Sequence, residues 1–424
     1  MTRSHDIPQF ASAFVTQPNM HADLDPQRAI LQISDTITAA LGPEPIDLLL
    51  WFASGSVANH TEQIAATISE RLNPRVQLGC TAIAVLHDER EYENASALSA
   101  LAARLPGATL TPFHLQAQNI SDWAALIADA DMFIEAIGAP KNPRLFVLLA
   151  DPATAPLDMG GEISISILRA LNDYFPGVPA VGGVASNGMH PNANCLLLNN
   201  VTTHTGVIGI AISGDIDIEV ITSQGCRPVG PIFTVTAAHE NLIDSLDGEK
   251  PLALLQQVVE NLSVNDRRLL HSGGLYVGRA VRRLADSDGA PGRGDFLVRG
   301  VLGIDSRTDA LMIADVADPG DMLQFHVRDA ATAVEDLELC LAPQAFSQPP
   351  SGALLFTCNG RGTHLFGRPH ADTSTIQQML ATDDAIPLAG FFCAGEIAPI
   401  GAHNFLHTHT ASVVLFRATT PQTL

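Results

Sequence analysis

The chain has 424 residues, of which 46% are hydrophobic and only 16% are charged, so an intrinsically disordered protein is excluded and two or three domains are expected. Acidic side chains outnumber basic ones by 45 to 23, and their repulsion of phosphate groups argues against nucleic acid or a membrane surface as a partner. No apolar run approaches the roughly 20 residues that are needed to span a bilayer.

The start of the chain and its cysteines indicate a cytoplasmic protein. Residues 1–19 contain early charges and a proline, and they lack the cationic-then-apolar order of a secretory signal. The six cysteines form no C-x-x-C pair, which is the spacing of zinc ribbons and thioredoxin-like sites. We therefore expect reduced, mostly buried thiols and neither a cofactor nor a metal.

Residues 1–40 are expected to form an N-terminal extension, which is followed by the first of three similar units. In this unit the sequence predicts a strand at 48–52, a helix at 61–72 and a glycine-containing strand at 76–85. Ile64, Ile68 and Leu72 recur every four residues, which is typical of one buried helix face.

The second unit is the most complete of the three. It is predicted to contain a strand at 145–149, a helix at about 162–175, a glycine-rich strand at 179–183, and strands at 196–198 and 207–212.

The segment between the second and third units does not repeat this pattern. Its predicted strands are 217–222, 233–237, 296–304, 312–313 and 322–327, and its predicted helices are 251–262 and 330–341. A loop is expected at 285–294, where Gly, Pro and Asp are frequent. Seven arginines between positions 267 and 299 favour a solvated basic surface over an anion site. The chain is divided into an N-terminal domain, 41–235, and a C-terminal domain, 236–424.

The third unit is predicted to contain a strand at 353–357, a helix at 375–381, a glycine-rich strand at 387–393 and a strand at 411–416. A helical crossover makes neighbouring strands parallel, whereas short loops make them antiparallel. Repeated strand-helix-strand-strand units therefore predict an α/β fold whose mixed sheets are covered by helices, arranged in two subdomains.

Polar residues gather after the strands of the third unit. Cys358, Asn359 and Arg361 follow one strand, and Cys393 and Glu396 follow the next. Loops beyond the carboxyl ends of strands are favoured ligand sites in α/β proteins, so these residues mark the candidate site. The planar guanidinium of Arg361 suits a carboxylate ligand, and an internal salt bridge is the structural alternative.

Other chemistries stay open at this cluster. Cys358 or Cys393, activated by a histidine, would make the protein a hydrolase or a transferase, although no local nucleophile signature is present. His407 and His409 would share one face of a strand, but two histidines are a weak metal signal. A further alternative is a partner-binding scaffold, in which the repeated units supply only surface.

Several motifs resemble those of the FIST domain family. The runs 351–362, 387–401 and 404–407 are similar to its C-terminal region, and the runs 179–186, 224–230 and 298–305 are similar to earlier parts of it. The resemblance covers roughly residues 45–417. Thr408 and His409 depart from it, because a glycine followed by an aromatic residue is expected there.

This resemblance implies a bacterial intracellular signal-transduction protein that senses a small ligand, such as an amino acid or a small carboxylate, and that is not an enzyme. No output domain is recognisable, so the partner would be a separate output protein or a second copy of the chain. The matched positions that the resemblance implies as ligand-binding residues are Arg227, Arg299, Cys358, Asn359, Arg361, Cys393, Glu396, Asn404 and His407.

Overall fold

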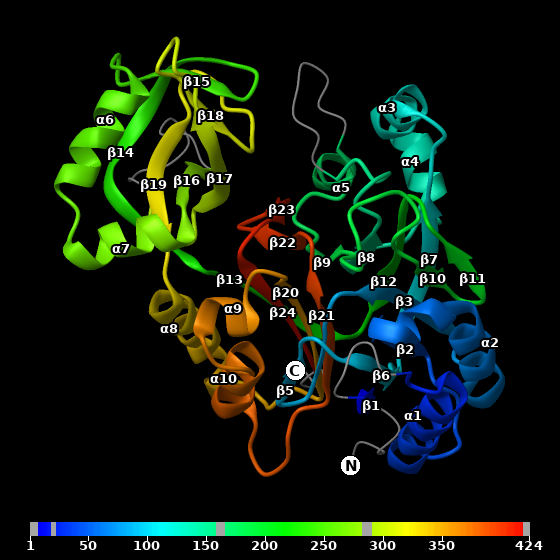
Figure 1. The fold of residues 1–424 in the computed structure, drawn as a ribbon. Helices are drawn as coiled ribbons and strands as arrows, with labels where there is room; N and C mark the ends of the chain where they lie inside the picture. The colour runs from blue at the N-terminus through cyan, green and yellow to red at the C-terminus, as the bar shows by residue number, and fades with distance from the viewer. Residues whose placement is uncertain (1–6, 18–22, 158–165, 282–290, 419–424) are drawn as a thin grey trace, which may run out of the picture.

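The structure is a computed structural model that describes residues 7–17, 23–157, 166–281 and 291–418. Within these residues it contains three six-stranded sheets and one closed six-stranded barrel. Figure 1 shows the barrel strands, β14 to β19, standing apart from the body that holds the three sheets. The expected α/β fold in two parts, with mixed sheets and covering helices, is confirmed. None of the described helices is long and apolar enough to cross a membrane.

The first sheet is built mainly from the first unit. It also contains a strand from residues that precede this unit in the sequence. In sheet order its strands are β1 (Gln9–Gln17), β6 (Ser96–Arg104), β2 (Leu48–Ser54), β3 (Val76–Ala82), β10 (Leu196–Leu198) and β11 (Val201–Thr203). Its helices are α1 (Pro26–Leu41), the short 3₁₀ helix η2 (Gly55–His60) and α2 (Thr61–Leu72). The predicted helix at 61–72 is thus found at the same residues.

The second sheet repeats this plan. Its strands, in order, are β23 (His403–His407), β22 (Glu396–Ile400), β9 (Ala180–Val184), β8 (Pro143–Ala150), β12 (Val207–Gly214) and β7 (Ala108–Leu115). Its helices are α3 (Ile120–Ala128), α4 (Ala130–Ala136) and α5 (Ile167–Tyr174). The helix that the sequence predicts at 162–175 corresponds to α5, and its first four residues lie outside the described part of the chain.

The third sheet has the same order of elements. Its strands are β13 (Asp217–Gln224), β24 (Thr410–Arg417), β20 (Gly352–Cys358), β21 (Leu388–Cys393), β4 (Val85–His87) and β5 (Arg90–Tyr92). Its helices are α8 (Ala330–Leu341), the 3₁₀ helix η4 (Ala342–Phe346), α9 (Gly362–Phe366) and α10 (Ala371–Leu380).

Alternating side chains give every sheet two buried faces. In β2, Leu48, Leu50 and Phe52 point into a core that all three sheets share, whereas Leu49 and Trp51 pack against α1 and α2. The strands β8 and β20 contribute to the shared core in the same alternating way. A strand that is buried on both sides has a continuous apolar sequence, and the sequences of these strands show that pattern.

A glycine at the same place in each unit lets the two parallel strands approach. A Cβ atom on Gly182 would lie 1.9 Å from the carbonyl oxygen of Leu148, and one on Gly390 would lie 1.8 Å from that of Leu355. The first unit has Gly79 at this position, with a corresponding distance of 2.7 Å. The glycine-rich strands of the repeated units are therefore required by close backbone packing.

The three units exchange hairpins. The hairpin β4–β5 leaves the first unit and pairs with β21 of the third sheet. The hairpin β22–β23 leaves the third unit and pairs with β9 of the second sheet, and β10–β11 leaves the second unit and pairs with β3 of the first. Each sheet is therefore completed by another unit, and the exchange closes into a ring of three.

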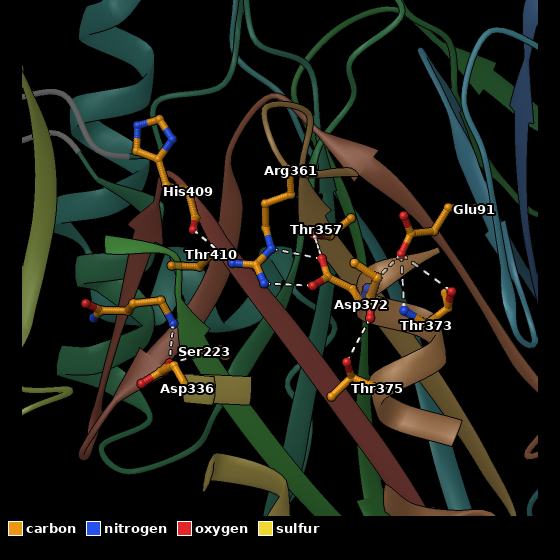
Figure 2. Close-up of polar contacts among 12 residues, drawn as sticks. Glu91, Ser223, Asp336, Thr357, Arg361, Asp372, Thr373, Thr375, His409 and Thr410 are labelled. Atoms are coloured by element: carbon orange, nitrogen blue, oxygen red, sulfur yellow. Dashed lines mark hydrogen bonds and ion pairs between the residues drawn. The ribbon is translucent and has the colours of Figure 1, made fainter. Parts of the chain in front are cut away.

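Glu91, in one exchanged hairpin, holds the beginning of α10. Its carboxylate accepts hydrogen bonds from the backbone amides of Asp372 and Thr373, at 2.9 and 3.1 Å, as Figure 2 shows in part. A carboxylate at this position satisfies amides that lack a partner within the helix. The predicted helix at 375–381 begins four residues earlier, at Ala371, because its cap comes from this distant segment.

The barrel is inserted between β13 and α8. Its strands, in order around the barrel, are β14 (Cys226–His239), β15 (Leu242–Leu246), β18 (Leu311–Ile313), β17 (Phe296–Ile304), β16 (Leu275–Ala280) and β19 (Met322–Arg328). Two helices, α6 (Pro251–Glu260) and α7 (Val264–Gly273), accompany it. The expected domain boundary at 235/236 falls inside β14, and most of the loop expected at 285–294 lies outside the described residues.

Polar contacts attach the barrel to the rest of the molecule. The side chain of Gln224 donates a hydrogen bond to the carbonyl of Phe296 at 2.6 Å, and Thr408 donates one to the carbonyl of Val298 at 3.2 Å. The chain enters the barrel next to Gly225, whose amide donates to the carbonyl of His409 at 3.0 Å. The base of the barrel is thus fixed on the third unit.

Candidate functional site

Three of the expected site residues come together at the strand ends of the third sheet. Cys358 and Cys393 end the parallel strands β20 and β21 in register, and Glu396 begins β22. One oxygen of Glu396 accepts hydrogen bonds from the amide and the hydroxyl of Thr410, at 3.1 and 2.9 Å. Burial raises the pKa of Glu396 to about 8, so its carboxyl group is mostly protonated at neutral pH.

Arg361 is buried in an ion pair with Asp372. Its Nε and one terminal nitrogen donate hydrogen bonds to the two carboxylate oxygens, at 2.8 and 2.7 Å, and the second terminal nitrogen lies 3.4 Å from the carbonyl of His409 (Figure 2). Arg361 is 0% exposed and Asp372 2%. The guanidinium therefore occupies the internal salt bridge that was the structural alternative to ligand binding.

The surroundings of the two thiols do not activate them. Burial, followed by the nearby Glu396, raises the pKa of Cys358 to about 12, and the same causes raise the pKa of Cys393. A catalytic cysteine needs a lowered pKa or an adjacent base that takes its proton. The sulfur of Cys358 instead accepts a hydrogen bond from the amide of Gly360 at 3.5 Å.

Other expected residues hold the fold together. Arg227 pairs with Asp329 at 3.0 Å and also with Asp266. The amide group of Asn404 joins β23 to the start of β9, where it accepts from the amide of Ala180 at 2.7 Å.

Two more expected residues lie elsewhere in this region. The ring of His407 is buried, and its Nε2 lies 3.0 Å from the carbonyl oxygen of Ala398. Asn359 is exposed at the turn that follows β20.

Two barrel residues, Tyr276 and Arg328, also contact the segments at these strand ends, although no local motif in the sequence indicated them. The ring of Tyr276 meets that of His409 edge to face, with centroids 4.6 Å apart, and Arg328 donates a short hydrogen bond to the carbonyl of Gly360. Burial, then the charges of Arg328 and Arg361, lower the pKa of His409 to about 3. His409 also has a φ of 69°, a conformation that costs energy for a residue with a side chain.

An open space near these strand ends lies beside the second sheet. A cavity of about 570 Å³ is bordered by the ends of β8 and β9, by the loop before α3 and by the end of β23. Trp123, Leu157 and Met189 supply apolar surface, and Asp151 and Thr154 supply polar atoms. These five residues were absent from the expected site, because none of them lies in a run of sequence that resembles the family.

Arg299 lines a second cavity, of about 360 Å³, on the side of the barrel that faces this sheet. Its Nε lies 3.7 Å from the carboxylate of Asp315, which Arg279 also contacts at 3.0 Å. Leu406 and Thr408 border both cavities, so the two spaces adjoin at the end of β23. We call the two cavities together the barrel crevice. Arg299 is thus an expected site residue that borders an open space.

The described part of the chain holds no cluster of three His, Cys, Asp or Glu side chains that would suit a metal ion. His407 ends β23, whereas His409 follows in a left-handed conformation before β24. The strand face that these two histidines were expected to share is therefore interrupted.

Comparison with known proteins places the chain in a family. The model of the FIST N domain matches residues 47–249, and the model of the FIST C domain matches residues 251–399. The uncharacterized protein MT0656 of Mycobacterium tuberculosis is 37% identical over 365 residues, which cover 84% of this chain and 88% of that protein. The uncharacterized protein Mb0898c of Mycobacterium bovis is 35% identical over 396 residues, which cover 92% and 96%. The chain therefore belongs to the FIST family, whose domains are generally taken as sensory domains of signal transduction.

Proposed function

We propose that this protein is a cytoplasmic sensor that binds an amino acid or another small carboxylate in the barrel crevice. Family membership supports a sensory role, and the crevice supports a site for the ligand. The volumes of its two cavities fall within the range of small-molecule sites, which is roughly 300–1,000 Å³.

The observation that carries this proposal is the position of Arg299. Among the residues that line the two cavities it is the only lysine or arginine, and the other polar side chains of its cavity are those of Asn241, Asp315 and Thr408. A guanidinium carries five N–H donors in a planar fork, so Arg299 can bind a ligand carboxylate in addition to Asp315, which it already contacts at 3.7 Å. Asp315, next to it, would accept hydrogen bonds from the ammonium group of an amino acid.

The position of the crevice between two bodies accounts for sensing. One wall belongs to the barrel and the other to the second sheet, whereas the barrel is attached to the third unit. A ligand that contacts both walls stabilises the arrangement in which they are close, and it shifts the population toward that state. A separate output protein, or a second copy of the chain, would then recognise the barrel position.

Calorimetric titration with glycine, acetate, glutamate, leucine and phenylalanine tests the proposal. Saturation at about 100 times the dissociation constant should stabilise the folded protein by about 2.7 kcal/mol. Replacement Arg299→Gln should weaken binding at least about tenfold, since a hydrogen bond to a charged group contributes about 1.5–3 kcal/mol.

The matched control is Arg307→Gln, which removes an exposed arginine of the same barrel and should leave binding unchanged. The proposal fails if no member of the panel binds, or if both arginine variants bind like the original protein while remaining folded by circular dichroism.

A further inference from the structure

The lining of the larger cavity constrains the rest of the ligand. Twelve of its 18 residues are apolar, and they include Trp123, Leu157, Val184 and Leu406. Apolar side chains that surround a space of this size favour an apolar guest, because contact with water is removed from both surfaces.

The charged residues of the larger cavity do not favour a negatively charged ligand group. Neither lysine nor arginine is among its lining residues, and its one carboxylate belongs to Asp151. This carboxylate is fully buried and already accepts hydrogen bonds from the amide of Ala153 at 3.2 Å and from the hydroxyl of Thr154 at 2.7 Å. A negatively charged group of the ligand would lose its water here without gaining a partner of opposite charge.

The rim of the crevice carries apolar side chains that water reaches. Ile120 and Met189 border the larger cavity and are 53% and 69% exposed, and Leu302 borders the smaller one and is 60% exposed. Large apolar side chains gathered around an opening are typical of binding sites. They would cover the apolar part of a ligand that enters from solvent.

From this division we infer that the ligand is a carboxylate with an extended apolar group. Its carboxylate lies at Arg299, and its apolar group passes Thr408 into the larger cavity. This inference rests on the proposed function, and it assigns a chemical class to the ligand. Two sources share the chemistry: amino acids with large apolar side chains, and acids that lack the amino group.

A series of ligands that differ only in chain length tests the inference. Titration with acetate, butyrate, hexanoate and octanoate should show an affinity that rises about fourfold with each methylene until the cavity is filled. The corresponding straight-chain 2-amino acids form the second arm, and the arm with the tighter binding identifies the source. Glutarate and adipate, which end in a second carboxylate, should bind more weakly than hexanoate.

A variant that fills the larger cavity provides the structural control. Ala153 is exposed and lines this cavity, so Ala153→Trp should occupy the space and remove the dependence on chain length while acetate still binds. Ala136, an exposed residue at the end of α4 that lines neither cavity, provides the matched replacement Ala136→Trp, which should bind the whole series like the original protein. Thermal denaturation verifies that both variants are folded.

The possible failures are distinguishable. If acetate and octanoate bind equally well and both depend on Arg299, the inference about the apolar group is wrong while the proposed function stands. If no acid of either arm binds, both are wrong. If the protein forms dimers that Ala153→Trp disrupts and that no acid affects, a second copy occupies the crevice, and the inference is again wrong.

Discussion

The ion pair between Arg361 and Asp372 should be a large source of stability, although Arg361 resembles a ligand-binding residue in the sequence. Both side chains are almost completely buried, and two hydrogen bonds of 2.7 and 2.8 Å join them. Removal of one partner from a buried pair leaves an unpaired charge, which costs about 3–5 kcal/mol. Arg361→Met should therefore lower the free energy of unfolding by about that amount, as should Asp372→Asn.

A double variant measures the interaction between the side chains of Arg361 and Asp372 apart from their contacts with other residues. Asn at position 372 keeps a hydrogen-bond acceptor for the hydroxyl of Thr357, which contacts the aspartate at 2.8 Å. Arg361→Met combined with Asp372→Asn should therefore be more stable than the sum of the two single effects predicts, with a coupling energy of up to about 3 kcal/mol. Urea denaturation followed by circular dichroism and by tryptophan fluorescence measures the three variants.

An exposed ion pair of equal length serves as the control. Arg71 and Asp35 also lie 2.7 Å apart, but their side chains are 38% and 70% exposed. Arg71→Met should cost no more than about 1 kcal/mol, because water screens the pair. If Arg361→Met costs as little as Arg71→Met, the buried pair is not structural and the argument from burial is refuted.

Three further predictions concern a carboxyl group, a glycine and the thiols. Burial raises the pKa of Glu396 from 4.5 to about 8, so its contribution to stability should decline as pH rises from about 5 to 8. The decline should be at most about 1.4 kcal/mol per pH unit. Urea denaturation at several pH values should show a smaller decline for Glu396→Gln than for the original protein. Gly390→Ala should destabilise the protein by about 2 kcal/mol or more, whereas Gly300→Ala, which has open space around its Cβ, should cost much less in the same assay. In the native protein, iodoacetamide should label Cys358 and Cys393 far more slowly than free cysteine at pH 7.5, and fast labelling of either by mass spectrometry would contradict their raised pKa values.

The local elements of the fold were predictable because each leaves a strong pattern in the sequence. The helix at 61–72 was found through its apolar stripe, and α8 appeared at 330–341 as expected. The hairpin exchange was not predictable. Strand β4 has only three residues and pairs with β21, which follows it by about 300 positions, so no local pattern indicates the partner.

The site was only partly predictable, for a related reason. The sequence suggested that Arg361 binds either a ligand or an acidic side chain, and the chain contains 45 acidic residues. Asp372 is the partner because the turn after β20 and the start of α10 bring the two together. Arg299 was nominated by family resemblance, but the cavity beside it forms only when barrel and sheet are assembled.

The ring of exchanged hairpins also governs how the molecule could be divided. A fragment that contains two of the units would have one sheet without its outer strands and one hairpin without a sheet to join. Both would expose unpaired backbone groups, which favour aggregation. Removal of one unit therefore damages the other two, whereas the barrel, which is inserted between β13 and α8, gives no hairpin from its described residues to this ring.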